Sequence, residues 1–78
     1  MKYNNGTITF NVADACTLNL VLYNNNAMNV SLDGNSLTAT ASESYSSDAT
    51  KFTYSITQAG TITLTGTSGY IGLIEVIF

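Results

Sequence analysis

Apolar and polar residues alternate along almost the whole chain, and this alternation limits most strongly what the chain can fold into. A period of two places successive side chains on opposite faces of an extended strand, so each run has one apolar face. The runs with this pattern cover residues 7–12, 18–23, 28–32, 37–39, 52–56 and 61–65. We find no useful length of helical spacing. The pattern therefore predicts an all-β fold, a small antiparallel β-sandwich or jelly roll of about seven to eight strands.

Turn residues between the runs predict which strands are joined as hairpins. Asp33-Gly34 is a strong two-residue signal, because both positions tolerate positive φ. Gln58-Ala59-Gly60 suits a three-residue loop with its glycine left-handed, so the strands on either side of it are expected to pair. Asn24-Asn25-Asn26 can close a similar loop.

Two segments depart from the alternation. Residues 41–49 are polar and rich in serine, so we expect a long connection that crosses between the sheets. Residues 70–78 are apolar on both faces apart from Gly72 and Glu75. An exposed strand of this kind aggregates, so we expect it at the centre of a sheet with both faces covered.

The length and composition indicate one extracellular domain. The 78 residues make a single domain, residues 1–78, and the one cysteine, Cys16, excludes an internal disulfide. Only 9% of residues are charged, and neutral hydroxyl-rich surfaces of this kind are typical of extracellular bacterial β-modules. The residues after Met1 contain no apolar run of a signal peptide. Either the protein stays inside the cell or, as we expect, it is a domain excised from a longer secreted chain, at the cell surface or outside the cell.

The charge balance argues against two classes of partner. The net charge is −3, and Lys2 and Lys51 are the only basic residues. Two lysines cannot supply the positive charge that nucleic acids or anionic membrane surfaces attract. No stretch approaches the roughly 20 apolar residues of a membrane span. We expect neither nucleic acid nor membrane as a partner.

The residues needed for common catalytic chemistry are missing. The chain has no histidine and no arginine, which excludes Ser-His-Asp and Cys-His sites and histidine-based metal sites. Cys16 has no basic neighbour to activate it and is expected to be a partly buried small hydrophobe. Among the five carboxylates, Asp14 and Asp33 are expected to serve turns, and Glu43 with Asp48 are the only local calcium candidates. We predict no enzyme activity, no catalytic or metal-ligating residues and no cofactor, and leave calcium binding near Glu43 and Asp48 open.

The five tyrosines give the strongest indication of a binding function, because a sugar ring can stack on an aromatic ring while amides and hydroxyls bond its rim. Tyr23 with Asn24, Asn25 and Asn26 is one candidate ligand-binding group, and Tyr45 with its polar segment is the other. For each ring the alternative is an ordinary exposed tyrosine. The remaining tyrosines are expected elsewhere: Tyr54 in the core, Tyr70 in the core or as an anchor, and Tyr3 near the N-terminus.

Several segments resemble a known group of modules. Phe52-Thr53-Tyr54, the stretch 58–64, Gly69-Tyr70-Ile71 and Ile74-Glu75-Val76 are similar to the C-terminal part of small β-sandwich modules. Such modules are appended to secreted bacterial pectate lyases and other polysaccharide-degrading enzymes. They often close with a Tyr-Ile pair, a short gap and an Ile-x-Val strand. The first half, with its 6–10 strand and Asp33-Gly34 turn, is similar in a looser way.

The resemblance implies a carbohydrate-binding or accessory role in an extracellular enzyme. The chain lacks the tryptophan of many such modules and the basic cluster that an anionic pectin would need, so a neutral polysaccharide or oligosaccharide suits it better. The sequence thus predicts a non-catalytic carbohydrate-binding or accessory module of a bacterial polysaccharide-degrading enzyme. The alternative is a structural or self-assembling interaction domain of a bacterial surface protein, which associates through its sheet edges.

Overall fold

The protein is a small all-β sandwich, as the alternation predicted. The computed structural model describes residues 2–24 and 27–78, and for residues 2–5, 67 and 68 it describes the backbone alone. The strands of this part of the chain are β1 (Lys2–Val12), β2 (Cys16–Tyr23), β3 (Asn29–Leu32), β4 (Asn35–Ser36), β5 (Ala41–Ser46), β6 (Ala49–Ile56) and β7 (Gly60–Ile77). They form two antiparallel sheets of four strands each, because the long β7 contributes to both.

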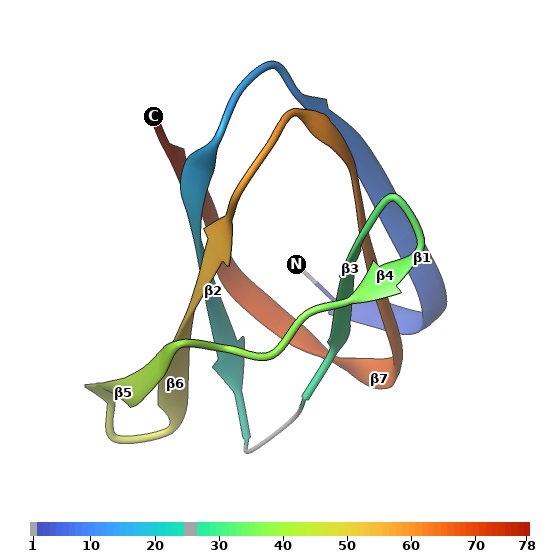
Figure 1. Cartoon of the computed structure of the whole chain (residues 1–78). Coiled ribbons are helices and arrows are strands. Elements are labelled where there is room, and N and C mark those ends of the chain that lie inside the picture. Colours follow the sequence, from blue (N-terminus) through green and yellow to red (C-terminus); the bar gives the residue numbers. More distant parts are fainter. Residues whose placement is uncertain (1, 25–26) are drawn as a thin grey trace.

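The two sheets are joined through β7, which bends from one into the other (Figure 1). In sheet A, the first half of β7 (residues 60–70) lies between β1 and β3, and β4 extends the sheet beyond β3. In sheet B, the second half of β7 (residues 71–77) pairs with β2, which is followed by β6 and then β5. Sheet A therefore ends in β1 and β4, and sheet B ends in β5 and the second half of β7.

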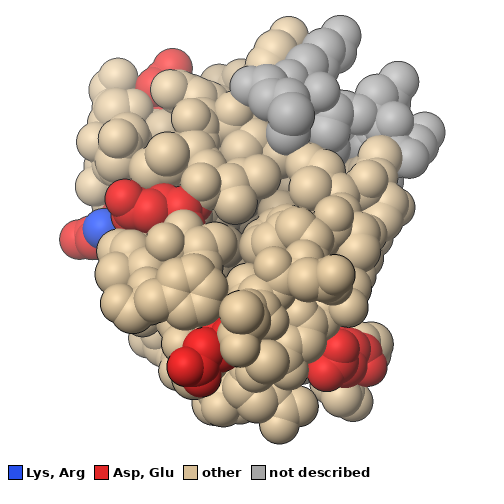
Figure 2. All heavy atoms as spheres, turned by 90° about the horizontal axis from the view of Figure 1, so that it is seen from above, with Lys and Arg blue, Asp and Glu red and all other residues tan. Residues whose placement is uncertain are grey.

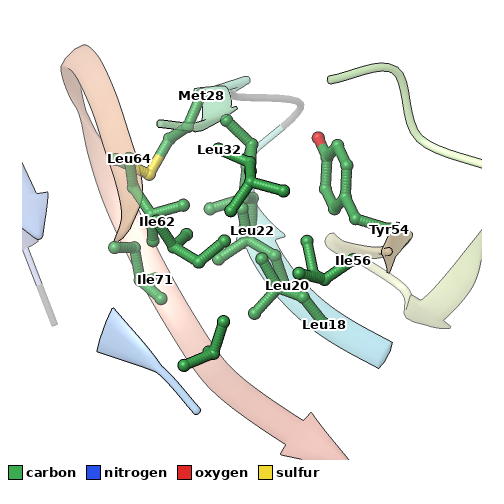
Figure 3. Packing of buried hydrophobic residues seen from close by; sticks show 12 residues of the cluster. Leu18, Leu20, Leu22, Met28, Leu32, Tyr54, Ile56, Ile62, Leu64 and Ile71 are labelled. Atoms are coloured by element: carbon green, nitrogen blue, oxygen red, sulfur yellow. The ribbon is translucent and has the colours of Figure 1, made fainter. Parts of the chain in front are cut away.

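The apolar faces of the two sheets meet in one core. Figure 3 shows Leu18, Leu20 and Leu22 of β2 directed toward the side chains that β3 and the first half of β7 contribute. β6, the second half of β7, the end of β1 and the residue before β3 complete the cluster. Its buried members are Val12, Leu18, Leu20, Leu22, Met28, Val30, Leu32, Tyr54, Ile56, Ile62, Leu64 and Ile71. The inward positions of each strand are two residues apart, so the alternation predicted these faces correctly.

The Asp33-Gly34 hairpin forms as predicted. Asp33 and Gly34 have φ values of 50° and 85°, the left-handed pair that a two-residue hairpin turn requires. Leu32 pairs with Asn35, and the N–H of Leu37 donates to the carbonyl of Val30 at 2.8 Å. The turn is tied to the start of β7, because the Asp33 carboxylate accepts a hydrogen bond from a β7 backbone N–H.

The predicted hairpin around residues 58–60 is wrong. β6 pairs with β2 and β5 in sheet B, and residues 61–65 pair with β1 and β3 in sheet A, so residues 57–59 cross between the sheets. Gly60 is not left-handed; instead it leaves room for Asp33, whose carboxylate oxygen would lie 2.5 Å from a β-carbon at position 60. Strands in two facing sheets bury every second residue in the shared core, just as two paired strands do. The alternation of apolar residues therefore could not distinguish a hairpin from a crossing between the sheets.

The serine-rich segment also differs from its predicted role as a connection. Residues 41–46 form β5, which pairs with β6 across a turn at Ser47 and Asp48. All six side chains of β5 are exposed, because β5 lies at the edge of sheet B and outside the core. An edge strand needs no apolar face, and this is why the segment lacked the alternation of the other strands.

The expected central position of residues 70–78 is wrong as well. Among the described residues, β2 is the only strand that pairs with residues 73–77, so this segment is an edge of sheet B. Ile74 and Val76 pack against the core, but Leu73 and Ile77 are 37% and 50% exposed. Tyr70, expected in the core or as an anchor, is 46% exposed. The central strand of sheet A is instead the first half of β7.

Candidate functional site

The two groups predicted separately as ligand-binding residues lie next to each other at one end of the sandwich. Tyr23 ends β2 and pairs with Ala49 at the start of β6. The following residue, Asn24, has a φ of 57° and donates its backbone N–H to the carbonyl of Asp48 at 2.8 Å. The chain after β2 is thereby bonded to the turn between β5 and β6. Asn25 and Asn26, the other two predicted residues, lie outside the described residues.

A polar concavity of about 380 Å³ is present where these segments meet. We call it the hairpin pocket; its lining residues are Asn24, Ser44, Ser46, Ser47, Asp48, Ala49 and Thr50. Five of the seven side chains end in a hydroxyl or an amide, and one in a carboxylate. This is a set of hydrogen-bond donors and acceptors that suits a ligand with several hydroxyl groups.

Local hydrogen bonds order the lining of the hairpin pocket. The Ser46 hydroxyl donates to Oδ1 of Asp48 at 3.1 Å, and the Ser44 hydroxyl donates to the carbonyl of Ser46 at 3.1 Å. Together with the Asn24–Asp48 backbone bond, these contacts link the β5–β6 turn on both of its sides. The pocket is therefore built from groups whose relative positions the turn already fixes, which lowers the entropy lost on binding.

Tyr45 is displaced from the regular ladder beside the hairpin pocket. The pairing of β5 with β6 shifts between Ser44 and Ser46, so Tyr45 lies in a β-bulge. Its side chain is 55% exposed. Bulges re-aim side chains at sheet edges and are common next to binding sites. Tyr45 belongs to the strand that supplies Ser44 and Ser46 to the pocket, although it is not itself a lining residue.

Tyr23 has a different environment. It lies on the outer face of sheet B, as predicted from its position opposite the β2 leucines, and it is half-buried. Its ring packs over Gly72, where a β-carbon would lie 2.7 Å from Cε2. Part of this ring is therefore occupied by the protein itself, which leaves Tyr45 as the better exposed of the two candidate rings.

The outer face of sheet B also carries a polar row that the sequence did not reveal. The Thr53 hydroxyl donates to Oδ1 of Asn19 at 3.0 Å, and Nδ2 of Asn19 donates to a carboxylate oxygen of Glu75 at 2.9 Å. Asn19 is only 7% exposed. These three residues oppose one another across β6, β2 and β7, and only knowledge of the strand order could have predicted them as a group.

Charged groups are sparse and separated on the surface. Figure 2 shows the acidic side chains as isolated patches on a surface of mostly uncharged residues, with a basic group beside one of them. The structure gives one ion pair among the described residues, between Lys51 Nζ and Glu43 Oε1 at 3.0 Å. The described residues hold no group of three or more histidine, cysteine or acidic side chains that could bind a metal ion. The two carboxylates considered for calcium have protein partners: Glu43 pairs with Lys51, and Asp48 accepts the hydrogen bond from Ser46.

Two groups, one in the core and one packed against it, have perturbed pKa values. Burial raises the pKa of the Cys16 thiol, and the nearby Asp14 carboxylate raises it further. This is the opposite of thiolate activation, and Cys16 packs against the core as the small hydrophobe that was predicted. Burial also raises the pKa of Tyr54, which is only 6% exposed and is confirmed as a core residue. Both shifts favour the neutral form of a packed side chain.

The described part of the chain contains no helix with the length and apolar content of a membrane span. Comparison with protein-family models, with curated proteins and with solved structures gave no match to this chain.

Proposed function

We propose that the protein binds a neutral oligosaccharide or polysaccharide without catalysing a reaction, as an accessory module of an extracellular bacterial polysaccharide-degrading enzyme. The observation that carries this proposal is the exposed, bulged Tyr45 on the strand whose neighbouring serines line the polar hairpin pocket. The module holds the attached enzyme at the polysaccharide and so raises the local concentration of the enzyme there.

Recognition divides between the ring and the pocket. The apolar face of one sugar unit stacks on Tyr45, and the hydroxyl groups at the sugar rim bond to the Asn24 amide, the serine hydroxyls and the Asp48 carboxylate. These are single, mostly neutral hydrogen bonds to a shallow site, so the affinity for one sugar unit is low. A polymer compensates by presenting many copies of the same unit.

The charge of the site selects against acidic polymers. Asp48 lines the hairpin pocket, and the whole chain carries a net charge of −3 with two lysines. The lysine on β6, Lys51, is held by Glu43. A polyanion such as polygalacturonate therefore meets repulsion and no basic group, whereas a neutral glucan, mannan or xylan does not.

Affinity electrophoresis in gels that contain one polysaccharide each tests the proposal. We expect a neutral polymer to retard the native protein and polygalacturonate to leave it unretarded. Tyr45→Ala should weaken the binding about tenfold, which corresponds to roughly 1.4 kcal/mol.

Tyr70→Ala is the matched control, because Tyr70 is a tyrosine of similar exposure, 46% against 55%, on β7, a strand that contributes no residue to the lining of the hairpin pocket. It should bind as the native protein does. The proposal is overturned if no neutral polymer retards the native protein, or if the two alanine variants lose binding equally while both stay folded by circular dichroism.

A further inference from the structure

The edge strands of the two sheets differ in how well they are protected against pairing with another chain. β4 is two residues long, which is too short to template a new strand. β5 carries a bulge and exposed polar side chains. β1 presents exposed hydroxyl and amide groups from Thr7, Thr9 and Asn11 on its outer face. Bulges, polar side chains and short length are the usual means by which proteins prevent edge-to-edge association.

The edge formed by residues 73–77 is less protected, because the register shift in its pairing lies before Leu73, at Gly72, and leaves residues 73–77 regular. It contains no proline and no lysine, and Glu75 is its single charge. That carboxylate already accepts a hydrogen bond from the buried Asn19 at 2.9 Å. The outward side chains on either side of Glu75 are Leu73 and Ile77, which are 37% and 50% exposed, and Phe78 follows at 74%. This edge thus offers backbone hydrogen-bonding groups together with exposed apolar side chains.

We propose that this edge pairs with the same edge of a second copy of the chain, antiparallel and about a two-fold axis. Among the edges of the described chain, it is the only one with large aliphatic side chains exposed, since β5 exposes a single tyrosine within its bulge, so its best complement is itself. Two-fold pairing is isologous: one contact patch serves both copies and the assembly closes as a dimer. The two four-stranded B sheets then form one continuous sheet of eight strands.

The single charge restricts the register of this pairing. A two-fold axis at Glu75 would place the two carboxylates directly opposite each other, which destabilises an antiparallel pair. A shift of one residue in the axis, to Ile74 or Val76, removes this conflict and keeps each side chain on its own face. Glu75 then lies opposite Leu73 or Ile77 of the other copy. The Glu75 carboxylate stays on the outer face of the joined sheet, and the apolar side chains beside it gain cover.

The dimer has a consequence for binding that rests on the proposed function. Sheet B runs from β7 through β2 and β6 to β5, so the two hairpin pockets lie at the outer edges of the joined sheet. Seven strand spacings separate the two β5 strands, a distance of roughly 34 Å along the sheet. Both pockets remain open, and one polymer chain can occupy both, which raises the avidity.

Sedimentation velocity without any glycan tests the dimer separately from sugar binding. We expect the native chain to shift from monomer to dimer as its concentration rises. Added salt should favour the dimer, because it screens the net charge of −3 on each copy. Ile77→Glu places a second carboxylate on the edge, close to Glu75 of either copy. This variant should stay monomeric at concentrations where the native chain is a dimer.

Thr9→Glu is the matched control, since it adds the same charge to an exposed position of the other long edge, β1. It should form dimers as the native chain does, and so should Tyr45→Ala. Leu73→Glu serves as a second variant if Ile77→Glu fails to fold. A native chain that stays monomeric at high concentration and high salt overturns the proposal, as does a folded edge variant that still forms the dimer.

Discussion

Sheet B ends on one side in β5 and on the other in the second half of β7, and these two edges are built from opposite kinds of residue. β5 is wholly exposed, polar and interrupted by the bulge at Tyr45. Residues 71–77 are mostly apolar. Ile71, Ile74 and Val76 pack in or against the core, whereas Leu73 and Ile77 are exposed. The difference shows how one sheet can keep one edge free for a small ligand and leave the other edge to associate.

The largest loss of stability is expected when the buried side chain at the start of the second half of β7 is shortened to alanine. Ile71 is 3% exposed and belongs to the core cluster, so Ile71→Ala should lower the free energy of unfolding by ~2–5 kcal/mol. That is a large share of the ~4–12 kcal/mol expected for a domain of this length. Urea unfolding at low protein concentration measures the loss.

Ile77→Ala is the matched control, the same substitution in the same strand at a half-exposed position. It should cost about 1 kcal/mol or less in the monomer, because its methyl groups are already partly in water. Equal losses at the two positions would show that the β7 edge is not divided into a buried and an exposed face.

A smaller effect is expected where the β7 edge meets Tyr23. Gly72→Ala would place its new β-carbon 2.7 Å from Cε2 of the Tyr23 ring, so the ring must move. Overpacking of this kind costs ~1–3 kcal/mol. Adding Tyr23→Ala should remove most of this cost, and a double-mutant cycle in thermal or urea unfolding measures the coupling. Additive losses in the cycle would contradict the contact between the two residues.

The smallest effect is expected from the ion pair of the β5 edge. Lys51 and Glu43 side chains are 30% and 65% exposed, so Glu43→Gln should cost only ~0.2–1 kcal/mol. The difference from the native protein should shrink in high salt, because screening weakens the native pair. A loss as large as that of Ile71→Ala, or one that salt does not reduce, would mean that β5 is held by more than solvated contacts.

The sequence predicted the faces of the strands better than their partners. Alternation placed Leu20 and Tyr54 in the core correctly, and Asp33-Gly34 formed its hairpin because its backbone angles depend on those two residues alone. The turn at Gly60 was misjudged because Ile56 and Ile62 are both buried in the one core, as they would also be in a hairpin. Pairing depends on long-range packing, which single-sequence alternation does not encode.

The candidate site was predicted only in part, because it too depends on contacts between residues far apart in the sequence. Tyr45 and Asn24 could be chosen from residue type and neighbours, but their proximity depends on the bond between Asn24 and the Asp48 carbonyl. Ser44 and Ser46 were covered only as part of a serine-rich loop. A Ser47-Asp48 pair between two short runs is the signal that could have predicted a hairpin there.

The most direct test of the division between the two edges is an amide-resolved NMR titration of the dilute monomer with a neutral oligosaccharide. We expect saturable shifts for the amides of Asn24 and of residues 44–50, and none for residues 73–77. No saturable shift with any neutral oligosaccharide, or shifts confined to residues 73–77, would contradict this expectation.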